Sequence, residues 1–239
     1  MQLFSLKEST LHVWDFDWTD VSESLLGEMQ SFLSPDERTR MERYKIPDDR
    51  ARFCMGRALL RHLGGRYLGR DGRALQISLG DHGKPRWREP CGDLCFSVSH
   101  SGAWVMMAFS MRREVGIDVQ FMDRRPRFDY MKIARHAFHP DEVYFLETCA
   151  EGLRRKKFYE IWTCKESVIK ASGEGVHGAM EKFSVLPLPE REEWTHVGRW
   201  QLKSLDVDAD TRAALAVEWA SENIAVERRG IADAGWGVF

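Results

Sequence analysis

Two lysines and a carboxylate interrupt a segment whose other residues predict a buried helix, Trp162-Thr-Cys-Lys165-Glu166-Ser-Val-Ile-Lys170. On a helical wheel, at about 100° per residue, Lys165 lies within an apolar stripe, and Glu166 and Lys170 stand one above the other along its edge. The stripe consists of Phe158, Ile161, Trp162, Val168 and Ile169. A cation in an apolar face is costly unless a counter-ion or an anionic ligand meets it. We therefore expect this helix to border an anion site; a snorkelling lysine beside an ordinary ion pair is the alternative.

A second carboxylate lies in a segment that predicts a strand. Apolar residues alternate with other residues over 115–121, as in a half-buried strand, and Asp118 and Gln120 project from the same face. Aspartate is depleted in strand interiors, which favours a specific role such as metal ligation or a buried hydrogen bond. Asp118 and Glu166 together would supply the hard oxygen ligands that Mg²⁺ prefers. An aspartate satisfied by neighbouring backbone amides is the structural alternative.

Taken together, four motifs in this chain resemble the signature of the Sfp-type 4′-phosphopantetheinyl transferases, in the same order. They are Gly83-Lys84-Pro85, Phe96-Ser-Val-Ser99-His100-Ser101-Gly102, Gly116-Ile-Asp118-Val and Trp162-x-x-Lys165-Glu166-Ser-x-x-Lys170. The resemblance implies an enzyme that moves the 4′-phosphopantetheine arm of coenzyme A to a serine of an apo acyl or peptidyl carrier protein. The products are the holo carrier, of fatty-acid or secondary-metabolite biosynthesis, and adenosine 3′,5′-bisphosphate.

The same resemblance implies roles for the residues of the last two motifs. Asp118 and Glu166 hold Mg²⁺ on the pyrophosphate, and Glu166 or a water beside it accepts the serine proton. Lys170 steadies the phosphate charge, and Lys165 contacts the phosphate or anchors the loop nearby. Gln120 stands where the family often has a second acidic residue, so it would ligate the metal through its amide oxygen or hold a metal-bound water.

The resemblance assigns the nucleotide of coenzyme A to residues of the first half of the chain. Arg52 matches the arginine that grips the 3′-phosphate, and Lys84, Ser99 and His100 match further contacts. Other basic residues would assist Arg52, and each of four could serve: Arg38, Arg40, Arg43 and Lys45. A serine nucleophile with its histidine base is disfavoured at Ser99 and His100, because adjacent residues of a strand point to opposite faces.

The implied fold is α+β, with two similar subdomains related by a pseudo-two-fold axis. We place the boundary at residue 115, so that residues 1–115 carry the nucleotide contacts and residues 116–239 carry the metal and catalytic residues. A Phe-Ser-Val sequence occurs in each half, at 96–98 and 183–185, and it suggests an internal repeat. Helices are expected from residue 35, over 50–63 before Gly64-Gly65, over 127–138, from 140 toward 153, and over 158–170. Strands are expected over 75–79, 95–99, 104–110 and 115–121.

Composition narrows the class of protein further. The 239 residues have a formal net charge of −2, and although Arg38–Arg73 is rich in basic residues, no nucleic-acid-binding motif accompanies them. The apolar runs are far shorter than the roughly 20 residues that span a bilayer, and the first residues lack the layout of a signal peptide. Five cysteines without a CxxC pair suggest neither a disulfide framework nor a zinc site. We expect a cytoplasmic monomer without membrane or nucleic-acid partners.

Two other classes of protein remain as alternatives. A Mg²⁺-dependent nuclease also combines Asp, Glu and Lys, but it usually places Glu-x-Lys on one strand, whereas Lys165 and Glu166 are adjacent on an expected helix. A carrier-binding module that has lost catalysis is suggested only by Gln120. The presence of Asp118, Glu166 and Lys170 favours the active enzyme.

Overall fold

The computed structural model describes residues 3–88, 91–123, 128–175, 180–190, 193–220 and 223–236. The chain forms two compact units, each treated by itself below. Unit 1 comprises Met1–Leu79, Pro85–Arg113 and Glu222–Phe239, and unit 2 comprises Gly80–Lys84 and Glu114–Ser221. Each unit is therefore assembled from separate stretches of the chain, whereas the expected division at residue 115 is a single point. In particular, the turn Gly80–Lys84 belongs to unit 2.

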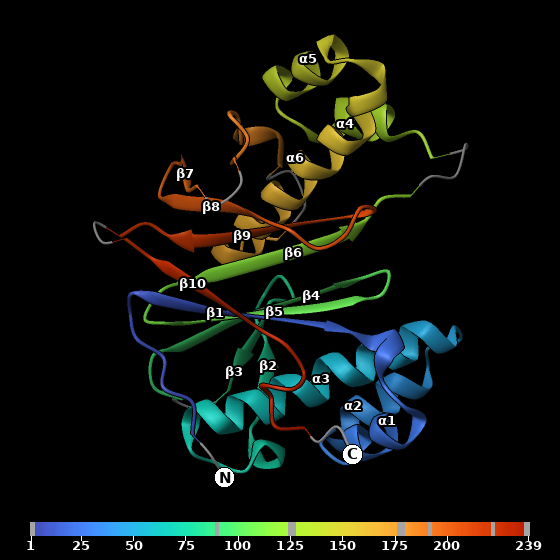
Figure 1. The fold of residues 1–239 in the computed structure, drawn as a ribbon, viewed down its shortest axis with the longest axis vertical. Helices are drawn as coiled ribbons and strands as arrows, with labels where there is room; N and C mark the ends of the chain where they lie inside the picture. The colour runs from blue at the N-terminus through green and yellow to red at the C-terminus, as the bar shows by residue number, and fades with distance from the viewer. Residues whose placement is uncertain are drawn as a thin grey trace. The chain divides into compact units, whose positions relative to one another are not determined.

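Unit 1 is built on a four-stranded sheet with the order β10-β1-β5-β4 (Figure 1). Its strands are β1 (Thr10–Asp17), β4 (Leu94–Ser101), β5 (Trp104–Met111) and β10 (Ala225–Arg229). The strands expected over 95–99 and 104–110 are confirmed as the antiparallel pair β4 and β5, in which Ser101 faces Trp104. β5 also pairs antiparallel with β1, and β10 adds a parallel edge strand from the far end of the chain.

The helices of unit 1 pack on one another and on this sheet. They are α1 (Glu23–Gln30), α2 (Pro35–Glu42) and α3 (Pro47–Leu68). Unit 1 also contains two short 3-10 turns, η1 (Trp18–Asp20) and η2 (Gly72–Ala74), and a small hairpin of β2 (Ile77–Leu79) and β3 (Pro85–Trp87). The start of α2 is confirmed, because Ser34 and Glu37 form a capping box ahead of Pro35. The strand expected over 75–79 begins later, at Ile77.

The helix expected to end before Gly64-Gly65 continues past both glycines, so that expectation is wrong. Helix α3 ends at Leu68, and Gly69 follows it in the left-handed conformation with φ of 65°. The two internal glycines serve close packing instead. A Cβ on Gly65 would lie 2.7 Å from the Arg70 carbonyl oxygen, and a Cβ on Gly64 would collide with the Trp87 ring.

Unit 2 contains a four-stranded antiparallel sheet with the order β6-β9-β8-β7. Its strands are β6 (Val115–Phe121), β7 (Thr195–Val197), β8 (Trp200–Leu205) and β9 (Thr211–Glu218), and its helices are α4 (Tyr130–Ala137), α5 (Pro140–Thr148), α6 (Glu151–Ser172) and the 3-10 turn η3 (Met180–Lys182). Helix α5 ends sooner than expected, because Cys149 is extended. Helix α6 covers the expected residues 158–170 but begins earlier, at Glu151, and it is followed by Gly173 in the left-handed conformation with φ of 74°. Arg127, the expected start of α4, lies outside the described residues.

The two units share one order of elements, which supports the α+β fold expected from the resemblance. In each, a strand is followed by a 22-residue helix and then by an antiparallel hairpin whose second strand pairs with the first strand. These are β1, α3, β4 and β5 in unit 1, and β6, α6, β8 and β9 in unit 2. The Phe-Ser-Val sequences are not part of this correspondence, because 96–98 lie in β4 whereas 183–185 lie in a loop.

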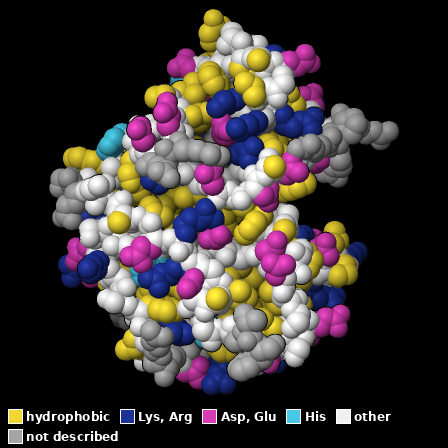
Figure 2. Space-filling model, in the orientation of Figure 1, with side chains coloured by type: hydrophobic (Ala, Val, Ile, Leu, Met, Phe, Trp, Pro, Cys, Tyr) yellow, Lys and Arg dark blue, Asp and Glu magenta, His cyan; other side chains and the backbone are white. Residues whose placement is uncertain are grey.

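Three general features bear on the class of protein. No helix in the described ranges is long and apolar enough to cross a membrane. The five cysteines, all of which fall within those ranges, form no disulfide. Figure 2 shows Lys and Arg side chains interspersed with Asp and Glu on the face that it draws, rather than one basic field.

Candidate active site

Gly116 allows strand β6 and helix α6 of unit 2 to approach each other closely. A Cβ at Gly116 would overlap the Ser167 carbonyl oxygen and lie 2.5 Å from the Ala171 backbone nitrogen. Any other residue would push the helix away from the strand. The glycine of the Gly-Ile-Asp motif therefore brings the motif's aspartate next to the polar residues of α6.

Asp118 and Lys170 form an ion pair across this contact. Lys170 Nζ lies 2.7 Å from Asp118 Oδ1, with Asp118 only 2% exposed and Lys170 28% exposed. Gln120 lies beside them, because its Nε2 donates to Asp118 Oδ2 over 3.2 Å. The strand thus places Asp118 and Gln120 together, as their spacing predicted.

Glu166 is the second carboxylate of this cluster. Its side chain is buried, and the charges of Asp118 and Lys170 act on it. Burial raises the pKa of Glu166 to about 7, the Asp118 carboxylate adds to the increase, and Lys170 opposes it. A carboxylate whose pKa lies near neutrality can accept and release protons at the pH of a cell, which suits a general base.

The cluster fits a divalent metal of the hard-oxygen class. Within the described parts of the chain, no group of three or more His, Cys, Asp and Glu side chains could hold a metal ion. Mg²⁺ needs less, because it is usually bound by one or two carboxylates with waters and substrate phosphates as the remaining ligands. Asp118 and Glu166 are two such carboxylates. After burial, the charge of Asp118 is the second cause of the raised pKa of Glu166, and a cation between the two groups would relieve that repulsion.

Lys165 does not join this cluster. It is fully buried, and its Nζ lies 2.8 Å from Glu142 Oε2 in an ion pair that is 0% exposed on both sides. The ammonium also donates to the carbonyls of Met180 and Phe183. Burial lowers the pKa of Lys165, and Glu142 opposes the shift. These contacts favour the other role expected of Lys165, that of an anchor for the loop, over a contact with coenzyme A.

Lys84 belongs to unit 2 and lies at the end of α6. Its Nζ donates to Glu114 Oε2 over 2.6 Å and to the Ala171 carbonyl over 2.9 Å. The carbonyls of the last helical turn have no partner within the helix, so Lys84 caps α6 just beyond Lys170. Lys84, which the sequence grouped with Arg52 and His100, thus has its contacts in unit 2.

In unit 1, Arg52 on α3 reaches the turn between β4 and β5. Its Nη1 donates to the Gly102 carbonyl over 2.8 Å, and its Nη2 pairs with Asp49. Its guanidinium also lies over the Trp18 ring, 5.7 Å from the centroid. Arg52 is thereby fixed beside the turn of the Ser-His-Ser-Gly motif.

The serine and histidine of that motif lie at the end of β4, where Ser99 is buried and His100 is exposed. Their opposite orientations agree with the argument against a serine and histidine dyad. The structure thus brings Arg52 and His100 to one end of unit 1, and Asp118, Gln120, Glu166 and Lys170 together in unit 2.

Sequence reasoning missed Glu142 and Glu114. Glu142 follows Pro140 and Asp141, and that position signals the third residue of a helix, where a capping glutamate is common. Nothing in the sequence pairs it with a lysine 23 positions later. Glu114 precedes β6 and resembles an ordinary exposed acid, so its partner Lys84 could not be identified before the fold was known.

Comparison with known proteins identifies the family. Residues 114–220 match the 4′-phosphopantetheinyl transferase superfamily, and residues 17–112 match the family described as 4′-phosphopantetheinyl transferase, N-terminal. The chain therefore belongs to the 4′-phosphopantetheinyl transferase family, as its four motifs indicated. This membership favours group transfer over the nuclease alternative.

Individual relatives agree with this assignment. The 4′-phosphopantetheinyl transferase HetI of Nostoc sp. is 32% identical over 217 residues, which cover 89% of this chain and 90% of the relative. A putative 4′-phosphopantetheinyl transferase of Synechocystis sp. is 34% identical over 84% of each chain. The 4′-phosphopantetheinyl transferase Sfp of Bacillus subtilis is 31% identical over 65% of this chain and 66% of the relative.

Proposed function

We propose that this enzyme transfers the 4′-phosphopantetheine arm of coenzyme A to a serine of an apo acyl or peptidyl carrier protein, and releases adenosine 3′,5′-bisphosphate. The observation that carries the proposal is the cluster of Asp118, Glu166 and Lys170 in unit 2, within the stretch that matches the transferase family. Two carboxylates and an ammonium in a partly buried site suit phosphoryl transfer, which depends mainly on positioning and charge.

Glu166 acts as the general base in this proposal. The carrier serine hydroxyl attacks the β-phosphorus of the pyrophosphate, and its proton passes to Glu166 directly or through a water molecule. One P–O bond forms to the serine, and the P–O bond to adenosine 3′,5′-bisphosphate breaks. In the metal-free protein, burial and the nearby Asp118 raise the pKa of Glu166 to about 7, which shows that this carboxylate readily takes up a proton.

Mg²⁺ is the proposed cofactor, with Asp118 and Glu166 as its protein ligands. When bound, the ion supplies neutralisation of the charge on the pyrophosphate oxygens. Gln120 would contribute by turning its amide, so that the oxygen rather than Nε2 faces Asp118 and the metal position. Lys170, which now pairs with Asp118, would then be released to bind a phosphate oxygen.

The nucleotide end of coenzyme A is assigned to Arg52, His100 and Ser99 of unit 1. The fixed guanidinium of Arg52 and the exposed ring of His100 offer donors at one end of the unit for the 3′-phosphate. Lys84 is the further contact inherited from the resemblance. Its present partners, Glu114 and the Ala171 carbonyl, support a role in fixing the end of α6 as well.

We also propose that the enzyme is a cytoplasmic monomer without membrane or nucleic-acid partners. The five cysteines without a disulfide agree with a reducing compartment. The mixed charge on the face in Figure 2 gives no sign of a duplex-binding surface. Size-exclusion chromatography with light scattering tests the oligomeric state.

The central experiment is incubation of the enzyme with coenzyme A, Mg²⁺ and a panel of apo carrier proteins. Intact mass spectrometry should show the added mass of the arm on at least one carrier. The same carrier with its acceptor serine changed to alanine should remain unmodified, and EDTA should suppress the reaction. A plasmid incubated with Mg²⁺ should stay intact. If no carrier gains mass, the proposed function is wrong.

A further inference from the structure

The fully buried pair of Lys165 and Glu142 is the strongest feature of unit 2 that the proposed reaction does not use. Both side chains are 0% exposed, and the two charges lie 2.8 Å apart. A buried ion pair seldom stabilises a fold more than well-packed apolar residues of the same volume would. A pair in this position therefore suggests a specific geometrical role.

Each hydrogen-bonding group of this pair has a partner. A lysine ammonium has three donors, and Lys165 has three acceptors, which are Glu142 Oε2 and the carbonyls of Met180 and Phe183. The Phe183 ring also lies 4.4 Å from Nζ. These contacts use the whole donor capacity of the ammonium, and they leave none for a phosphate of coenzyme A.

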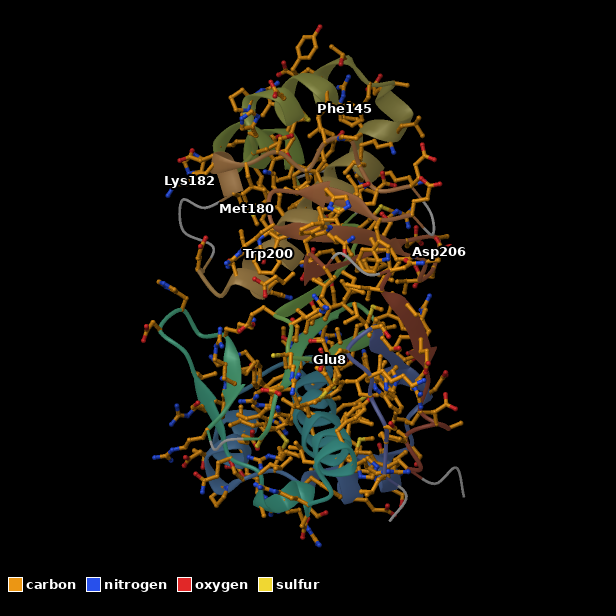
Figure 3. The ribbon with its side chains drawn as sticks, turned by 90° about the vertical axis from the view of Figure 1, so that its left-hand side faces the viewer. Glu8, Phe145, Met180, Lys182, Trp200 and Asp206 are labelled. Atoms are coloured by element: carbon orange, nitrogen blue, oxygen red, sulfur yellow. The ribbon has the colours of Figure 1, made fainter. Side chains whose placement is uncertain are left out.

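Glu142 extends the network to three separate parts of unit 2. Its Oε2 accepts from the His139 backbone N–H at the start of α5, over 3.0 Å. Its Oε1 accepts from the Val185 backbone N–H over 2.8 Å. The pair thus joins α5, α6 and the segment 180–185, in which Met180 and Lys182 are labelled in Figure 3.

The position of Lys165 within α6 connects this network to the active site. Lys165 immediately precedes Glu166, and adjacent residues of a helix point about 100° apart. A side chain held at this angle from Glu166 therefore fixes the rotation of the helix about its axis. That rotation decides whether Glu166 and Lys170 face Asp118, which lies on β6.

We propose that Lys165 and Glu142 form a buried brace that sets the rotation of α6 and seats the segment 180–185. Lys165 is then a positioning residue and does not contact coenzyme A. The kinetic part of the test rests on the proposed transferase function, whereas the labelling part does not. The brace gives the first lysine of the Lys-Glu motif a role separate from that of Lys170.

Substitutions that remove one or both charges of the pair test the brace, because their effects should not be additive. Lys165→Met leaves the Glu142 carboxylate buried without its cation, and Glu142→Gln leaves the ammonium without its anion. In the double variant the Gln amide can donate to a carbonyl that Lys165 has released, and no buried charge remains. Lys157→Met is the matched control, because Lys157 pairs with Glu160 on the partly exposed side of the same helix.

Transfer kinetics, measured on variants whose near-ultraviolet circular dichroism is native, give the first readout. Each single substitution should lower kcat by roughly tenfold or more, with little change in the KM for coenzyme A, and the double variant should recover much of the loss. The control should match the parent. The brace is refuted if Lys165→Met raises the KM for coenzyme A while Glu142→Gln does not, or if both single variants keep the parent kcat.

Lysine acetylation of the parent enzyme gives a second readout that needs no substitution. Peptide mapping after limited treatment with acetic anhydride should find Lys165 unmodified with and without coenzyme A, and Lys157 modified in both cases. Lys170 should be modified only without coenzyme A. Modification of Lys165 that coenzyme A prevents would overturn the brace. Lack of protection at Lys170 would instead count against the proposed function and leave the brace standing.

Discussion

Lys170 Nζ lies 2.7 Å from Asp118 Oδ1, although 52 residues separate them in the chain. The contact depends on Gly116, whose missing side chain lets β6 lie against α6. An ammonium in this position stabilises the buried Asp118 carboxylate and limits the rise in the pKa of Glu166. In the proposed reaction Asp118 and Glu166 would hold Mg²⁺ and Lys170 would bind a phosphate oxygen; in the resting site Lys170 is paired with Asp118 instead.

Replacing Glu166 by glutamine should abolish transfer without disturbing the fold. The amide has nearly the same volume, but it can neither accept the serine proton nor contribute a negative charge to the metal. Loss of a general base lowers rates by about 10²- to 10⁴-fold. Steady-state transfer assays measure the loss, and Glu160→Gln on the same helix serves as the control. Near-normal turnover of Glu166→Gln at saturating Mg²⁺ would contradict the assignment.

Stability should depend on pH through Glu166 when no metal is present. Its pKa is about 7 in the folded protein against 4.5 ordinarily, so between these values the folded state holds a proton that the unfolded state releases. The free energy of unfolding should therefore fall as pH rises through this window, by about 1.4 kcal/mol per unit of pKa shift. Urea unfolding in EDTA from pH 5 to 8 measures this fall. In Glu166→Gln it should be smaller, and equal slopes would contradict the raised pKa.

The sequence sufficed for features that depend on local pattern. The 3.6-residue period placed Glu166 and Lys170 on one helix, and the alternation of residues 115–121 placed Asp118 and Gln120 on one strand face, where a hydrogen bond now joins them. Pairings that depend on tertiary packing could not be predicted. The partner of Lys165 comes from α5, and the apolar stripe alone does not distinguish a buried counter-ion from a ligand.

The end of helix α3 could not be predicted from its glycines. Gly64-Gly65 resembles a helix end, because glycine commonly follows the last helical turn. Here both glycines lie inside α3. Glycine is needed at these positions because the Trp87 ring and the backbone near Gly72 approach the helix too closely for any side chain. A close approach by residues far along the chain leaves no local signal. For the same reason, the assignment of Gly80–Lys84 to unit 2 was not evident from the sequence.

Arg52→Ala and His100→Ala should weaken the binding of coenzyme A more than the binding of dephospho-coenzyme A. Both residues are assigned to the 3′-phosphate, which the second ligand lacks. A charge-assisted contact contributes about 1.5 to 3 kcal/mol, or roughly 10- to 100-fold in affinity. Isothermal titration calorimetry with both ligands measures the difference. Arg50→Ala, an exposed change on the same helix, should alter neither affinity, and equal losses for the two ligands would contradict the assignment.

Gly116→Ala should destabilise unit 2 and impair transfer. The added methyl group would overlap the Ser167 carbonyl oxygen, so β6 and α6 must separate, at a cost of about 1 to 3 kcal/mol for an overpacked core. The same separation moves Asp118 away from Glu166 and Lys170. Gly152→Ala is the control, because a Cβ there meets nothing within 4 Å and alanine favours a helix. Chemical denaturation compares the two variants, and equal stability would show that the contact can relax.

Gln120→Glu should lower the Mg²⁺ concentration that gives half-maximal activity. Gln120 shares a strand face with Asp118 and lies 3.2 Å from it, so the substitution places a third carboxylate beside the metal position. Cation sites gain affinity with the number of charged ligands.

Without metal, the same carboxylate should repel its neighbours and raise the pKa of Glu166 further. Activity at limiting Mg²⁺ should then fall earlier in the variant as the pH is lowered. Titrations of activity against Mg²⁺ at two pH values, for the parent and for Gln120→Glu, measure both effects. Gln30→Glu, an exposed change on α1 of unit 1, serves as the control for added charge. An unchanged Mg²⁺ midpoint in Gln120→Glu would place Gln120 outside the metal site and leave Asp118 and Glu166 as its protein ligands.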